Sequence, residues 1–178
     1  DEHGNLLETR PADTTAPVLL AAARNVRTLS RNIQTELPKI TARARELAAT
    51  SDEKALLEFV RPWLARHYRG YEGLSTLHEL VCAAGRPRLE KAVKLEPEAA
   101  LKELETLARD YVHSPVEAEA LLESARLLDE VKKDRPTART LLKRISDELP
   151  WPENSAACTA ARKKLRDFRR EEIQKREA

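Results

Sequence analysis

This sequence is poor in several features on which whole classes of protein depend. It contains four glycines, two cysteines, and only seven aromatic residues, namely two Trp, three Tyr and two Phe, among 178 residues. Four scattered glycines exclude a glycine-rich phosphate loop, and two distant cysteines, Cys82 and Cys158, do not make a disulfide framework. Whether they pair is left open. No apolar run approaches the roughly 20 residues that cross a bilayer, so we expect no membrane span.

The residues that are abundant favour helices. Ala, Leu, Glu, Lys and Arg dominate, all of them strong helix formers, and few segments alternate as a strand would. We therefore predict an all-α protein, with helical hairpins stacked as a short solenoid or packed as an irregular bundle. The formal net charge is only +2, from 32 basic and 30 acidic residues. A nucleic-acid partner is not expected on this balance, and another protein or a peptide is.

The order of the patterns predicts the domain organisation. Residues 1–16 lack helical periodicity and are interpreted as a flexible segment, and residues 17–178 as a single all-helical domain. Within that domain we expect N-terminal helices over 17–85, helical hairpins over 86–166 and a charged helical tail over 167–178. The state of oligomerisation is not indicated.

Apolar residues at steps of three and four predict the individual helices. One runs from Pro17 to about residue 47, with Pro38 inside it as a kink or as a break between two helices in line. Ser51 is the expected N-cap of the next helix. We expect Gly73 to act as a breaker, and Gly85 to end a short helix over 74–84. Further helices are predicted over 87–95, 97–111, 114–133, 135–149, and from about 155.

An internal repeat is visible in the C-terminal half. Small and large apolar residues recur at a constant offset of 38 positions, Ala100, Leu104, Leu107 and Val112 matching Ala138, Leu142, Ile145 and Pro150. Counted from Glu119, the segment resembles one unit of the tetratricopeptide repeat, a helix-turn-helix of 34 residues. The positions that carry the resemblance are Leu122, Ala125, Ala138, Leu142, Ile145 and Pro150, and Arg126 and Asp129 depart from the family pattern. The resemblance covers roughly residues 86–166.

This resemblance implies a stack of hairpins with a groove for a peptide or helix. Ala125 and Ala138 would let the two helices approach closely, while Leu122, Leu142 and Ile145 would fill the space between them. The exposed side chains of the first helix of the hairpin would then line the groove. The candidate partner-binding residues are Glu119, Glu123 and Arg126.

A second candidate surface lies in the segment RPWLARHYRGYEG, which interleaves aromatic residues with arginines. Such a pattern can anchor a protein partner, and the residues selected are Trp63, Arg66, Tyr68, Arg69 and Tyr71. The alternative is that the aromatic residues fill the core while the arginines are solvated.

The segment HELVC contains a pattern that suggests a metal site. His78 and Cys82 are four residues apart and share a helix face, as in zinc-binding helices, but no third ligand is evident nearby. The alternative is a pair of partly buried helix residues. We therefore assign no catalytic residue, no cofactor and no metal, and keep His78 and Cys82 as weak candidates.

These observations predict a non-enzymatic adaptor or scaffold that binds a peptide or helix. One alternative is an accessory helical domain of a larger polypeptide, since helical segments resembling residues 97–170 precede redoxin domains in some extracytoplasmic proteins. A metal-dependent helical enzyme is the other. The compartment is not indicated directly; a cytoplasmic location is favoured, and an extracytoplasmic one if the N-terminus at Asp1 results from processing.

Overall fold

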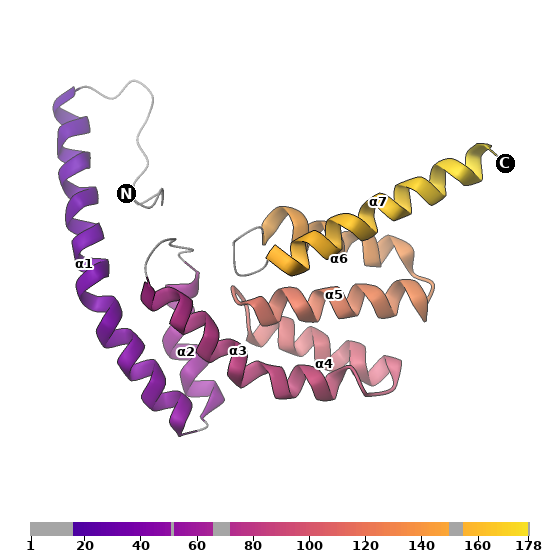
Figure 1. The fold of residues 1–178 in the computed structure, drawn as a ribbon, viewed down its shortest axis with the longest axis horizontal. Coiled ribbons are helices and arrows are strands. Elements are labelled where there is room, and N and C mark those ends of the chain that lie inside the picture. The colour runs from indigo at the N-terminus through magenta and orange to yellow at the C-terminus, as the bar shows by residue number, and fades with distance from the viewer. Residues whose placement is uncertain (1–15, 51, 66–71, 150–154, 178) are drawn as a thin grey trace. The chain divides into compact units, whose positions relative to one another are not determined.

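The computed structural model of the chain describes residues 16–50, 52–65, 72–149 and 155–177 (Figure 1). These residues form seven helices and no strand, which confirms the prediction of an all-α protein. The predicted flexible segment lies outside the described residues, except for its last residue, which begins the first helix. The helices are α1 (Ala16–Ala49), α2 (Glu53–Leu64), α3 (Glu72–Ala92), α4 (Pro97–Asp110), α5 (Pro115–Glu130), α6 (Arg135–Glu148) and α7 (Ser155–Glu177).

The chain divides into two compact units, residues 1–80 and residues 81–178. The division falls inside α3, close to the boundary that the sequence patterns place at 85/86. The candidate sites developed below lie entirely in the second unit. That residues 17–178 act as one domain stays a prediction.

The first unit contains α1 and α2, which pack against each other. α1 continues through Pro38 as one helix, so the alternative of two separate helices is wrong. The N-cap of α2 is Asp52, whose carboxylate accepts a hydrogen bond from the backbone N–H of Ala55 at 3.0 Å. Ser51, the predicted cap, lies outside the described residues. The apolar core of this unit is formed by Ile33, Leu37, Ala44, Leu56, Leu57, Val60, Leu64, Leu74 and Leu77.

Gly73 and Gly85 do not break helices, and both predictions are corrected. α3 begins before Gly73 and runs through both Gly85 and Pro87. The physical reason is close packing: a Cβ at Gly85 would lie 2.7 Å from Cε1 of Tyr111 and 2.9 Å from Cγ2 of Val116. Gly85 is thus needed where the Tyr111 ring crosses α3, and its conformational freedom is not used.

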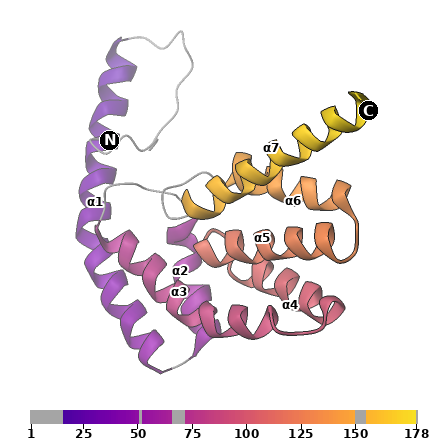
Figure 2. The same cartoon turned by 45° about the vertical axis from the view of Figure 1, so that its right-hand side comes forward.

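In the second unit, α5 packs against α4, α6 and α7, and α6 also packs against α7 (Figures 1 and 2). The predicted N-cap of α5 is confirmed as Ser114, with Pro115 at the first helical position. The repeat positions of α4 and α6 are all buried in this packing: Ala100, Leu104, Leu107, Ala138, Leu142 and Ile145. Ala125 is buried as expected, whereas Leu122 is only half-buried.

Candidate functional site

A groove of about 700 Å³ crosses α5 between α4 and α6, and we call it the apolar groove. Its half-exposed aliphatic side chains are Leu101 and Val112 from α4 and the turn after it, Leu128 from α5, and Leu141 from α6. Buried Leu121 completes the floor. Aliphatic side chains that stay partly exposed side by side mark a surface on which an apolar partner can be buried.

The rim of the apolar groove is charged and more basic than acidic. Lys102, Arg109 and Arg144 stand against a single acid, Glu105. The Arg109 side chain is 73% exposed. Arg144, in contrast, is already engaged, because its guanidinium donates to the carboxylate of Glu117.

Glu117 is the least expected residue of this region, an acidic side chain only 1% exposed. Its carboxylate binds the Arg144 guanidinium and accepts a hydrogen bond from the backbone N–H of His113 at 2.8 Å. His113 has a positive φ of 68°. The buried carboxylate therefore joins the α4–α5 turn to α6, which fixes two walls of the apolar groove. The Ser-x-x-Glu spacing from Ser114 to Glu117, typical of a capping box, was the signal that sequence reasoning missed.

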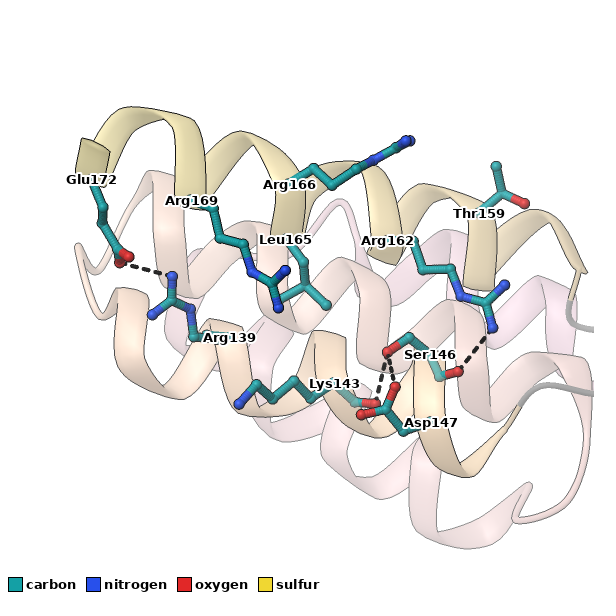
Figure 3. Close-up of a pocket in the computed structure, with 10 residues that line it drawn as sticks. All are labelled: Arg139, Lys143, Ser146, Asp147, Thr159, Arg162, Leu165, Arg166, Arg169 and Glu172. Atoms are coloured by element: carbon teal, nitrogen blue, oxygen red, sulfur yellow. Dashed lines mark hydrogen bonds and ion pairs between the residues drawn. The ribbon is translucent and has the colours of Figure 1, made fainter. Parts of the chain in front are cut away.

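A second groove, of about 640 Å³, lies between α6 and α7, and we call it the basic groove (Figure 3). Five of its side chains are cationic and two are anionic, an excess of three positive charges. The cations are Arg139, Lys143, Arg162, Arg166 and Arg169, and the anions are Asp147 and Glu172. Leu165 lies between Arg162 and Arg169 on α7.

The two grooves use different faces of α6. Thr137, Leu141 and Arg144 line the apolar groove, and Arg139 and Lys143 line the basic groove. Arg139 and Lys143 each lie two positions after a residue that lines the apolar groove, and two positions correspond to roughly 200° of rotation around a helix. Since the buried residues of α6 lie between them, a ligand in one groove need not compete with a ligand in the other.

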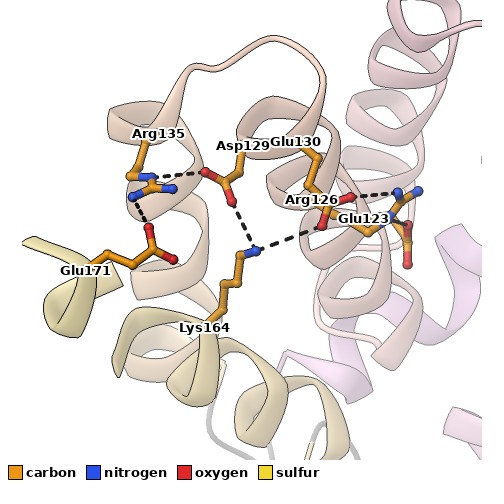
Figure 4. Close-up of polar contacts among 7 residues, drawn as sticks. All are labelled: Glu123, Arg126, Asp129, Glu130, Arg135, Lys164 and Glu171. Atoms are coloured by element: carbon orange, nitrogen blue, oxygen red, sulfur yellow. Dashed lines mark hydrogen bonds and ion pairs between the residues drawn. The ribbon is translucent and has the colours of Figure 1, made fainter. Parts of the chain in front are cut away.

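A cluster of charged side chains joins α5, α6 and α7, and we call it the ion cluster (Figure 4). At its centre is Asp129, whose side chain is 8% exposed and lies 3.0 Å from the Lys164 ammonium and 3.1 Å from the Arg135 guanidinium. Arg135 also pairs with Glu171 of α7 at 2.6 Å. Both cations lie over the buried ring of Phe168, at 4.6 Å for Arg135 and 5.5 Å for Lys164.

The protonation of Asp129 reflects this position. Burial alone would raise the pKa of its carboxyl group, but the hydrogen bonds from Lys164 and Arg135 and the charges of both outweigh burial and lower it. The aspartate is therefore ionised at neutral pH, and its negative charge holds two cations that would otherwise repel each other.

The predicted residues Glu119, Glu123 and Arg126 line neither groove. The Arg126 guanidinium pairs with Glu123 at 2.8 Å and with Glu130 at 3.3 Å, and this raises the pKa of Arg126, chiefly through the hydrogen bond to Glu123. Glu119 is half-buried. These three residues lie on the face of α5 opposite the apolar groove, so a partner that they bind would occupy a different surface.

The aromatic and arginine candidates belong to the first unit. Trp63 lies in α2 and is half-buried. The other four, Arg66, Tyr68, Arg69 and Tyr71, lie outside the described residues. Their role in binding stays a prediction.

His78 and Cys82 lie on α3, and Cys158 lies on α7. His78 is buried and Cys82 is half-buried, and no group of three or more potential metal ligands occurs in that part of the chain. Cys82 and Cys158 are not joined in a disulfide. Cys158 is buried in the α6–α7 contact, where its thiol donates to the carbonyl oxygens of Ile145 at 3.2 Å and Leu149 at 3.1 Å. Burial raises its pKa.

Comparison of the chain with models of protein families, with curated proteins and with solved structures found no match. Among the helices that the structure describes, none combines the length and the apolar character that crossing a membrane requires.

Proposed function

We propose that this chain is a non-enzymatic interaction module whose second unit binds an amphipathic helix of another protein in the apolar groove. The observation that carries the proposal is the row of half-exposed aliphatic side chains, Leu101, Val112, Leu128 and Leu141, contributed by α4 and the turn after it, by α5 and by α6. A helix that presents residues at i, i+3, i+4 and i+7 offers a matching apolar stripe.

The rim indicates the polar character of the bound helix. Lys102 and Arg109 are exposed cations on the rim of the groove, and Glu105 is the one acid among the described residues that line it. Acidic residues that flank the apolar stripe of the partner would meet these cations and fix its orientation. The proposed occupant is therefore an amphipathic helix with acidic flanks.

We further propose that α4 to α7 are tetratricopeptide-like hairpins. Support comes from the matched burial of Ala100, Leu104 and Leu107 in α4 and the residues 38 positions later in α6, and from the packing of α5 on both α6 and α7. Stacked hairpins expose a continuous surface suited to a helical or extended partner. An adaptor or scaffold role follows from such a surface.

A titration with a synthetic helix tests the proposal. The probe is a fluorescein-labelled amphipathic peptide with leucines at helical spacing and glutamates on both flanks, followed by fluorescence anisotropy. We expect saturable binding to the natural chain and a loss of at least about tenfold in affinity for Leu128→Glu/Leu141→Glu, because a buried charge opposes an apolar contact.

The matched control places the same charges outside the groove. Leu95 and Val131 are 47% and 48% exposed and line neither groove. Leu95→Glu/Val131→Glu should bind the peptide as the natural chain does. Equal binding by both double variants, or no binding by the natural chain, contradicts the proposal.

A further inference from the structure

We propose that the basic groove between α6 and α7 is a second binding site, which takes an acidic peptide segment. Lys143 projects from α6 and Arg169 from α7, so the cations come from both walls of the same groove (Figure 3). This site goes beyond the function proposed for the apolar groove, since it uses the other side of α6 and a different chemistry.

The charges of the basic groove are only partly neutralised within the chain. Glu172 pairs with Arg139 at 2.7 Å, and Asp147 accepts a hydrogen bond from the Ser146 hydroxyl at 2.6 Å. Among the described residues, Lys143, Arg166 and Arg169 have no carboxylate partner. Cations gathered in one groove repel one another, and a ligand that carries several negative charges relieves this repulsion.

The shape of the groove favours carboxylates on a peptide over phosphates. Its described lining residues lie along the sides of two helices, whose backbone N–H groups are used within the helices, so among these residues no loop offers backbone donors to a phosphate. Among the described residues that line it none is aromatic, so this part of the chain offers no ring for base stacking. Leu165, at the centre of the α7 wall, instead provides an apolar contact for an aliphatic side chain.

The acids at the two ends of the groove define the length of the ligand. Glu172 lies near one end and Asp147 near the other, as Figure 3 shows, so a long polyanion that continued past either end would meet a negative charge. Arg162 and Arg169 are seven residues apart on α7, about 10 Å along the helix axis. Two carboxylates at that separation occur at positions i and i+7 of a helix, or three residues apart in an extended peptide.

The test is the binding of a fluorescein-labelled pentapeptide of glutamates with a central leucine, measured by anisotropy at low salt and then at rising NaCl concentration. We expect binding that weakens with salt, and affinity reduced at least about tenfold in Lys143→Glu/Arg169→Glu. The same peptide with glutamine in place of glutamate should not bind. No binding of the glutamate peptide to the natural chain overturns the proposal.

The control changes the same charge on the same helix outside the groove. Lys163 and Lys175 are exposed and do not line the groove, so Lys163→Glu/Lys175→Glu should keep the affinity. Equal losses in both double variants would mean attraction by net charge alone and overturn the proposal. Competition by inorganic phosphate or by a single-stranded oligoribonucleotide at lower concentration than the unlabelled peptide would also overturn it.

Failure here is distinguishable from failure of the proposed function. Leu128→Glu/Leu141→Glu, which should lose the amphipathic helix, should still bind the acidic peptide. Lys143→Glu/Arg169→Glu should show the opposite pattern. Circular dichroism and thermal unfolding of both variants should match the natural chain, since none of these four side chains is buried.

Discussion

α4 and α7 flank the α5–α6 pair, and they are attached to it by different forces. α4 and the residue after it bury three large side chains, Leu104, Leu107 and Tyr111, whereas Phe168 is the one large side chain that α7 buries within the described residues. Each large apolar side chain that is fully buried contributes about 1.5–3 kcal/mol. α7 depends more on charge, through the ion cluster around Asp129. The attachment of α7, and with it one wall of the basic groove, should respond to pH and salt more strongly than that of α4, whose ion pair to the α5–α6 turn is the exposed Glu98–Lys132 contact.

Removing the one large anchor of α7 should have the largest effect. Phe168→Ala is expected to lower the free energy of unfolding by about 3–5 kcal/mol, because it empties the core position and removes the ring below Arg135 and Lys164. Hydrogen exchange should show that amide protection in α7 is lost before protection in α4. Equal loss of amide protection in α7 and α4 would contradict the claim that the two helices are attached by different forces.

Neutralising Asp129, at the centre of the ion cluster, should have the second largest effect on stability. Asp129→Asn is expected to cost about 1–3 kcal/mol, less than for a fully buried ion pair, because the side chains of Arg135 and Lys164 are 34% and 37% exposed. As a control, Asp167→Asn changes an exposed aspartate whose ion pair to Arg170 is 3.9 Å long, and should leave stability within about 0.5 kcal/mol.

The same variant makes a prediction for pH. The folded-state pKa of Asp129 is lower than the ordinary value of 3.8, so its contribution to stability is complete above about pH 4 and is lost as the pH falls through the folded-state pKa. The difference in unfolding free energy between the natural chain and Asp129→Asn should therefore shrink in acid. A difference that stays constant down to low pH would contradict the assignment.

A substitution at Gly85 tests the apolar packing around Tyr111, the residue that follows α4. In Gly85→Ala the new methyl group would lie 2.7 Å from the Tyr111 ring, which is 1% exposed and has little room to move. Overpacking costs about 1–3 kcal/mol, which exceeds the gain of up to about 1 kcal/mol from alanine in a helix. A net loss of about 1–2 kcal/mol, independent of salt, is expected in denaturant titrations. A more stable variant would mean that the ring moves aside.

The smallest effect is expected at the outer edge of the ion cluster. Glu123→Gln/Arg126→Gln removes an exposed pair three residues apart on α5, and such pairs contribute about 0.5 kcal/mol or less. Thermal unfolding should be nearly unchanged. A loss above about 1 kcal/mol would show that the pair supports the Lys164 contacts and belongs to the attachment of α7.

Sequence periodicity predicted the helices of the second unit well, because each has a regular apolar face. It failed where a distant residue decides the local structure. Gly85 was interpreted as a breaker, yet α3 continues through it, and a glycine is needed there because the Tyr111 ring, 26 positions later, occupies the space that a side chain would need. Tertiary packing outweighed a local preference there.

The grooves were harder to foresee than the helices. Leu128 and Leu141, or Lys143 and Arg169, become neighbours only when the partner of each helix is known, and no pattern in one helix specifies this. Glu117 could have been found from the sequence, because the Ser-Pro-Val-Glu spacing is typical of a capping box, in which the carboxylate turns back toward the backbone at the start of the helix, but this signal was missed.

The buried thiol of Cys158 makes it possible to measure how often the contact between α6 and α7 opens. Its thiol is buried between α6 and α7 and is hydrogen-bonded to two carbonyl groups. An alkylating reagent therefore reaches it only while α7 is separated from α6. At high reagent concentration the labelling rate equals the frequency of that opening. Because the natural thiol is the labelling site, no engineered label is needed to measure how often the contact between α6 and α7 opens.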